Sequence, residues 1–76
     1  MTEDDLMLLR SKEGKEPVKI CFTDGEEAVV KVLSVSETER DVIYDLVSSN
    51  FANKYKDTEG CFLANWDDIK YVSEVA

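Results

Sequence analysis

The chain has 76 residues, which is enough for one small domain. It carries 17 acidic residues against 9 basic ones and has no His, for a net charge of −8. Without His and with only two Cys, the chain cannot build a zinc finger, a Cys₄ site or a Ser-His-Asp triad. A core this small buries only about 60% of the surface of the unfolded chain, so a partner subunit often adds stability. We therefore expect self-association, with no metal and no cofactor.

The N-terminal segment is acidic and has only a short apolar run, residues 6–9. That run is far below the ~18 residues needed to span a bilayer, and the acids before it are the wrong charge for a secretion signal. We expect a cytoplasmic protein with no membrane partner. Cys21 and Cys61 are expected to be free thiols, with a disulfide between them as the alternative. The excess of acids opposes nonspecific binding to nucleic acid, so any RNA would need a small local site.

Residues 2–13 are expected to form a helix. Thr2 and Asp5 have the spacing of a capping box, and Gly14 provides a stop signal. We expect residues 1–14 to be a helical segment whose apolar face packs on the rest of the domain. The alternative is that this face is exposed and binds a partner protein. The expected packing face consists of Leu6, Met7 and Leu9.

From residue 17 to residue 76 the hydrophobic period changes to two, which predicts strands. The first strand ends at Asp24-Gly25, a strong hairpin signal. The next, over 27–36, changes its buried face near Val32, which indicates a bent strand. Further strands are expected over 41–48, 61–65 and 69–75, with a polar loop over 49–59. The expected fold is all-β, a small five-stranded, strongly bent antiparallel SH3-like barrel after one helix.

Two blocks of the chain resemble the Sm-like family, which includes the archaeal and eukaryotic Sm proteins and the bacterial RNA chaperone. The first block is residues 22–25 (Phe-Thr-Asp-Gly) with the long bent strand after them. The second, residues 60–72, is similar to the family motif Gly-x-φ-φ-Ile-Arg-Gly-Asp-Asn-Ile-x-φ-Ile, where φ is apolar. The likeness covers about residues 3–75 and implies an Sm-like barrel over 17–76. A small acidic chain of this kind also looks like one that a phage or other mobile element could encode.

The resemblance implies a ring of roughly five to seven copies, in which the fourth strand of one copy pairs with the fifth strand of the next. The barrel itself also favours such pairing between copies, because a five-stranded barrel leaves two strand edges open. The expected interface residues are Cys61, Phe62, Leu63, Ile69, Tyr71 and Val72.

The resemblance also implies RNA binding, although several pocket positions depart from the family pattern. The family's Arg-Gly pair is Asn65-Trp66 here, and its Asp after the second strand is Ser36. Asn65 could hydrogen-bond the edge of a nucleobase, or it could be an ordinary turn residue. Trp66 could stack on a nucleobase, or it could be an aromatic residue of the core or an interface. A second candidate segment, residues 51–56, interleaves lysines with aromatic residues. The alternative is an ordinary solvated loop. The candidate RNA-binding residues are Ser36, Asn65, Trp66, Lys54, Tyr55 and Lys56.

We expect no catalysis, because no general base of suitable pKa is evident beside a nucleophile. Asp67-Asp68 and the acids of the turn over 37–41 could hold a divalent cation weakly, but we expect a solvated acidic rim and predict no metal site. Two functions remain open. One is a homo-oligomeric Sm-like ring that binds single-stranded RNA with altered or weakened specificity. The other is an acidic interaction or scaffolding ring that binds a partner protein and not RNA.

Overall fold

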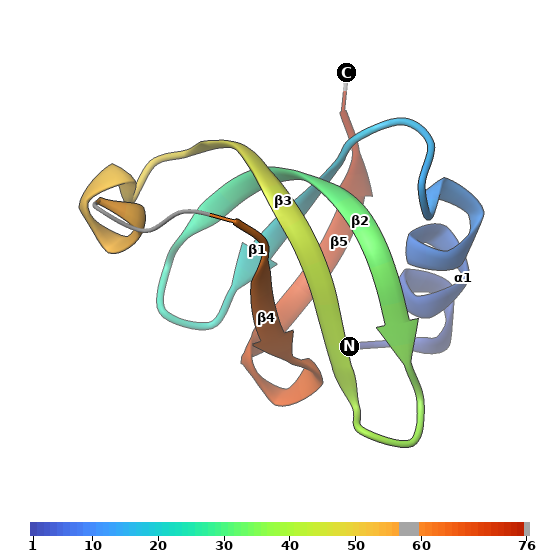
Figure 1. The fold of residues 1–76 in the computed structure, drawn as a ribbon. Coiled ribbons are helices and arrows are strands. Elements are labelled where there is room, and N and C mark those ends of the chain that lie inside the picture. Colours follow the sequence, from blue (N-terminus) through green and yellow to red (C-terminus); the bar gives the residue numbers. More distant parts are fainter. Residues whose placement is uncertain (57–59, 76) are drawn as a thin grey trace.

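The computed structural model describes residues 1–56 and 60–75. The five strands form one antiparallel sheet in the order β4-β3-β2-β1-β5, preceded by one α-helix (Figure 1). The predicted helix and five antiparallel strands are therefore confirmed, and two short 3₁₀ helices, η1 and η2, add to them. The elements are α1 (Glu3–Lys12), β1 (Val18–Phe22), β2 (Glu27–Ser36), β3 (Asp41–Ser49), η1 (Ala52–Tyr55), β4 (Phe62–Asn65), η2 (Trp66–Asp68) and β5 (Ile69–Glu74).

The sheet is open at both ends. Among the residues that the structure describes, no hydrogen-bonded ladder joins β4 to β5, so these strands are its two edges. The long strands β2 and β3 curve strongly (Figure 1). Because of this curvature, Ala64 of β4 and Val72 of β5 contribute to the same core. The structure thus shows a strongly curved sheet that is not closed, with open edges at β4 and β5.

The bend in β2 comes from irregular pairing with β3. The register shifts between Val32 and Ser34, which leaves Leu33 opposite no partner. Such a bulge bends the strand and changes which residues face inward. Val32 is fully buried, Leu33 is exposed, and Val35 packs partly against the core. The predicted change of buried face near Val32 is confirmed.

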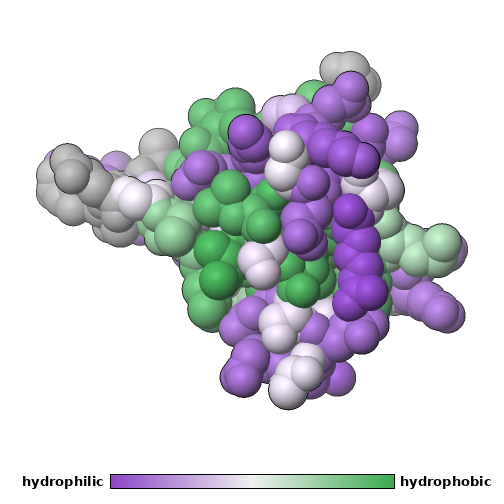
Figure 2. Space-filling view, turned by 45° about the vertical axis from the view of Figure 1, so that its right-hand side comes forward, coloured by the Kyte–Doolittle hydropathy of each residue, from purple (hydrophilic) through white to green (hydrophobic). Residues whose placement is uncertain are grey.

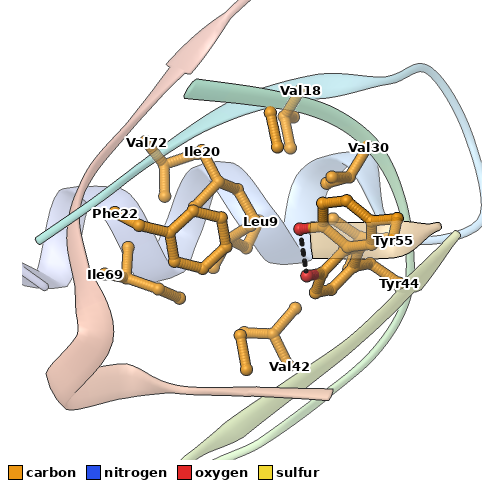
Figure 3. Packing of buried hydrophobic residues seen from close by; sticks show 13 residues of the cluster. Leu9, Val18, Ile20, Phe22, Val30, Val42, Tyr44, Tyr55, Ile69 and Val72 are labelled. Atoms are coloured by element: carbon orange, nitrogen blue, oxygen red, sulfur yellow. Dashed lines mark hydrogen bonds between the residues drawn. The ribbon is translucent and has the colours of Figure 1, made fainter. Parts of the chain in front are cut away.

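One hydrophobic core lies between the concave face of the sheet and α1. Alternate residues of β1 point into it, as their period of two predicts. Figure 3 shows Leu9 of α1 among the side chains of the strands. Cys21 is also buried and Cys61 is exposed, and both are free thiols as predicted. The buried hydrophobic cluster consists of Leu9, Val18, Ile20, Phe22, Ala28, Val30, Val32, Val42, Tyr44, Tyr55, Ala64, Ile69 and Val72.

Helix α1 begins with the predicted capping box. The Thr2 hydroxyl oxygen accepts from the Asp5 N–H (3.2 Å), and the Thr2 N–H donates to the Asp5 carboxylate (2.9 Å). The packing face differs from the prediction, because Leu8 and Leu9 face the core whereas Met7 is 64% exposed. Met7 and Leu9 are about 200° apart around a helix, so they cannot share one face. In the described part of the chain, no helix has the length and apolar character needed to cross a membrane.

Candidate functional site

The β2–β3 turn and η2 meet at one end of the sheet and bring two of the predicted RNA-binding residues together. The Trp66 N–H donates to the Arg40 carbonyl (2.9 Å), and the Trp66 indole N–H donates to the Asp41 carbonyl (3.1 Å). The Asn65 side-chain oxygen accepts from the Asp67 N–H (2.8 Å) and begins η2. These bonds give Asn65 a turn-capping role, and they hold Trp66 partly buried against the core.

Arg40 covers the ring of Trp66. Its guanidinium carbon lies 5.5 Å from the ring centroid, and its Nη2 lies 3.1 Å from a carboxylate oxygen of Asp67. Arg40 has a φ of 55°, a backbone conformation uncommon for residues other than Gly. Ser36, the third predicted residue at this end, accepts from the Glu39 N–H (3.1 Å) and so stabilises the same turn. The result is a guanidinium within cation–π distance of an indole at the rim of the sheet.

Acidic side chains outnumber basic ones at this end of the sheet. Residues 37–41 and 66–68, which are the β2–β3 turn with the first residue of β3, and η2, carry five acids against Arg40. Arg10 of α1 adds an ion pair with Glu37 (3.2 Å). The net field opposes the approach of phosphate groups. Among residues 1–56 and 60–75, no group of three or more His, Cys, Asp or Glu is placed to hold a metal ion.

A second cluster surrounds Glu26, whose side chain is fully buried. Its carboxylate accepts hydrogen bonds from the Ser49 hydroxyl (2.7 Å) and the Lys54 ammonium (2.6 Å). Lys54 Nζ also lies 4.9 Å from the ring centroid of Phe22 and 3.6 Å from the Asp24 carboxylate. These contacts attach η1 to the β1–β2 turn, which explains why a polar segment forms an ordered 3₁₀ helix.

The surroundings of Tyr44, Lys54 and Tyr55 raise the pKa of all three groups. Burial raises the pKa of Tyr55, and hydrogen bonds with Glu26 and Tyr44 raise it further. Burial also raises the pKa of Tyr44, whose hydroxyl lies 3.0 Å from that of Tyr55 (Figure 3). Burial alone would lower the pKa of Lys54, but its hydrogen bond and charge interaction with Glu26 outweigh burial and raise it. At neutral pH both tyrosines are neutral and Lys54 is charged.

This placement changes the roles predicted for the segment that contains Lys54, Tyr55 and Lys56. Tyr55 is only 9% exposed, so its ring is not available to stack on a nucleobase. The charge of Lys54 is offset by Glu26, and Lys56 lies exposed after η1. Sequence reasoning did not single out Glu26. The signal was available, because the alternation of Glu26 and Glu27 on entering β2 directs one acid inward and the other outward.

β4 presents an open edge at Leu63. Leu63 pairs with Ile43 of β3, and the ladder continues to the bond between the Trp66 N–H and the Arg40 carbonyl. Hydrogen-bonded and non-hydrogen-bonded pairs alternate along an antiparallel ladder. This alternation makes Ala64 the hydrogen-bonded residue and directs the N–H and C=O of Leu63 away from β3. The Leu63 side chain is 62% exposed, so both its backbone and its side chain face outward.

The edge of β5 is covered in part by α1. The Val72 N–H donates to the Asp5 carboxylate (3.1 Å), across 67 positions of sequence. Burial alone would raise the pKa of Asp5, but hydrogen bonds from the backbone of Thr2 and Val72 outweigh it, so the pKa lies below its ordinary value. Asp5 therefore acts as a hydrogen-bonded clip between the start of α1 and β5.

The predicted interface residues divide into two groups. Cys61, Leu63 and Tyr71 have exposed side chains. Phe62 packs edge-on against Tyr55 at 4.8 Å between centroids, and Ile69 and Val72 are buried in the chain's own core, so these three side chains are used within the chain itself. The Val72 N–H is likewise bonded to Asp5. Figure 2 shows hydrophobic residues (green) reaching the surface between hydrophilic ones (purple) on the face that it presents. The exposed large hydrophobic residues are Met7, Leu33, Val47, Phe51, Leu63, Tyr71 and Val75.

A half-open pocket of about 360 Å³ lies where β4 approaches the β1–β2 turn and η2. The Thr23 N–H donates to the Asp68 carbonyl (2.9 Å), which holds η2 against that turn. The pocket combines aromatic, aliphatic and charged side chains. Those that matter for its chemistry are Phe22, Tyr44, Leu63, Lys54, Asp24 and Asp68.

Comparison with family models, with curated proteins and with solved structures finds no match to this chain. The resemblance to the Sm-like family therefore stays an expectation drawn from residues 22–25 and 60–72, beside an observed fold of one helix and a five-stranded antiparallel sheet.

Proposed function

We propose that this chain is a non-catalytic, Sm-like interaction protein. Its copies assemble through the edges of β4 and β5 into a ring of roughly five to seven subunits, and each curved sheet acts as one barrel of that ring. The ring serves as an acidic platform for a partner protein. The observation that carries the proposal is Leu63, an apolar residue 62% exposed at the middle of an edge strand with its backbone groups facing outward.

Both strands carry features that suit edge pairing, beside the Val72 N–H of β5, which is already bonded to Asp5. β4 offers the outward N–H and C=O of Leu63, and β5 carries Tyr71, which is 46% exposed. Adding a strand from a second copy satisfies unpaired backbone groups and removes apolar side chains from water at the same time. Because the two edges are different surfaces, the contact is head-to-tail, and such contacts repeat around a closed ring when the rotation allows.

The test is a charged substitution on the β4 edge. Leu63→Asp places a carboxylate in the proposed interface and should convert the assembly to single chains. Leu33→Asp is the matched control, because Leu33 is an exposed leucine on the bulge of β2 rather than on an edge strand. Light scattering after size exclusion gives the mass of each variant, and circular dichroism checks that each is folded. An assembly that keeps its mass in folded Leu63→Asp contradicts the proposed interface.

RNA binding is the second candidate function, and the neighbouring Arg40 and Trp66 support it. Guanidinium and indole groups both stack on unpaired bases. The candidate is weakened by the acids around the pair, which repel phosphate. It is second to the platform function for that reason.

The RNA candidate is tested by filter binding with short U-rich and A-rich single strands at about 50 mM salt, where attraction to phosphate is strongest. Arg40→Ala should abolish binding. Arg10→Ala is the matched control, because Arg10 is likewise an exposed arginine in an ion pair with one acid. Absence of binding by the unmodified protein at this salt concentration rejects RNA as the ligand.

A further inference from the structure

The pocket beside β4 has a charge pattern that assembly through strand edges does not require. It is lined by Phe22 and Tyr44, which are only 5% and 3% exposed, and by Leu63, which is 62% exposed. Its rim carries Asp24 and Asp68, which the bond from the Thr23 N–H to the Asp68 carbonyl holds on neighbouring segments. A volume of about 360 Å³ lies in the range of small-ligand sites, which is about 300–1,000 Å³.

Among the described residues that line the pocket, Lys54 is the one basic residue, and its charge is already balanced by acids. Its ammonium lies 2.6 Å from the buried Glu26 carboxylate and 3.6 Å from Asp24. One oxygen of Asp24 accepts from the Glu26 N–H (3.0 Å), which fixes this carboxylate at the turn. In the described part of the chain, the Asp68 carboxylate has no hydrogen-bond or ion-pair partner. Counting Glu26, three carboxylates face one ammonium, so the site is net negative and attracts cations.

We propose that this pocket binds a Lys or Arg side chain from an extended basic segment of a partner protein. The aliphatic stem of such a side chain lies against Leu63, the exposed apolar residue of the pocket, as long basic side chains commonly lie on apolar surfaces. Its charged end reaches Asp68 at the rim. The net charge of −8 on the chain favours the same class of partner over anionic ligands. A single copy contains the whole pocket, but Leu63 also belongs to the proposed β4 interface, so pairing of β4 with a second copy and binding of a basic side chain compete for this residue.

The proposal is tested by NMR titration of the ¹⁵N-labelled protein with an acetylated, amidated Gly-Lys-Gly-Lys-Gly peptide at about 20 mM salt, where charge interactions are weakly screened. Saturable shifts are expected at the amides of Leu63, Ala64 and Asp68, which line or border the pocket. The same peptide with Glu in place of Lys should leave them unchanged. Absence of saturable shifts, or shifts confined to other parts of the chain, overturns the proposal.

Two variants separate the pocket from the general negative charge. Asp68→Asn should weaken binding of the Lys peptide about three- to fivefold, the effect of losing one exposed ion pair. Asp4→Asn, an exposed acid of α1, removes the same charge elsewhere and should leave affinity within about 1.5-fold. Equal weakening by both variants overturns a specific site. If the peptide does not bind, the pocket proposal is rejected. The sedimentation mass of the same samples then shows separately whether the proposed assembly is also absent.

Discussion

Glu26 is a charged residue that belongs to the core. Its side chain is fully buried, and its carboxylate is satisfied by Ser49 and Lys54. A buried carboxylate that loses its charge leaves its partner ammonium unpaired, which is more costly than the pair itself is stabilising. The ion pair therefore ties η1 to the β1–β2 turn.

Glu26→Gln should lower the free energy of unfolding by about 1–3 kcal/mol, because the buried side chain loses the charge that strengthens its hydrogen bonds with Lys54 and Ser49. Glu27→Gln, at the adjacent and exposed acid, should change it by less than about 1 kcal/mol. Urea denaturation of the two variants gives both values. Equal effects would show that Glu26 has no special role in stability.

Asp5 makes stability depend on pH. Its pKa is lower in the folded than in the unfolded chain, so its contribution is complete above the unfolded value of about 4 and is lost as pH falls through the folded value. Asp5→Asn should destabilise the protein by about 1 kcal/mol at pH 7 and should flatten the loss of stability below about pH 4. Asp4→Asn, at an exposed acid, should leave the acid transition unchanged. Denaturation curves at a series of pH values from 7 to 3 decide between these outcomes.

At the scale of elements, the packing of α1 depends on one leucine. Leu9 is fully buried against the sheet, whereas Met7 on the other side of the helix is 64% exposed. Leu9→Ala should lower the free energy of unfolding by about 2–5 kcal/mol, since it leaves a cavity. Met7→Ala should change it by no more than about 0.5 kcal/mol. Thermal and urea denaturation measure both effects, and a comparable loss in the two variants would contradict the observed packing face.

The regular elements could be predicted from the sequence because each has a local signal. The capping box at Thr2 and Asp5 locates α1, the period of two locates β1, and the change of phase at Val32 reports the bulge in β2. η1 could not be predicted in this way. Its order comes from contacts between Lys54 and Glu26, which lie 28 positions apart.

The candidate site could be predicted less well than the fold. Aromatic and basic residues in a polar segment suggested a nucleic-acid site. In the structure, however, Tyr55 is buried in the core and the Lys54 ammonium is hydrogen-bonded to the Glu26 carboxylate. The exposure of Met7 was missed because its neighbours are equally apolar, so the composition of the run does not show which residue faces out. The edges at β4 and β5 were expected from the resemblance to the Sm-like family. The order of the strands along the chain does not show them, because β5 returns to pair with β1.

At the scale of the whole molecule, two properties oppose each other. The edges at β4 and β5 favour strand pairing between copies, while the net charge of −8 makes copies repel. Repulsion reaches about 30 Å at 10 mM salt but only about 8 Å at 150 mM. Strand pairing acts at contact distance, so assembly should strengthen with salt over this range.

The mass in solution tests the proposed assembly most directly. Sedimentation equilibrium of the unmodified protein at micromolar concentration and about 150 mM salt should give roughly five to seven times the chain mass of 8.6 kDa. A mass of 8.6 kDa at all concentrations would contradict the proposal that β4 and β5 pair between copies.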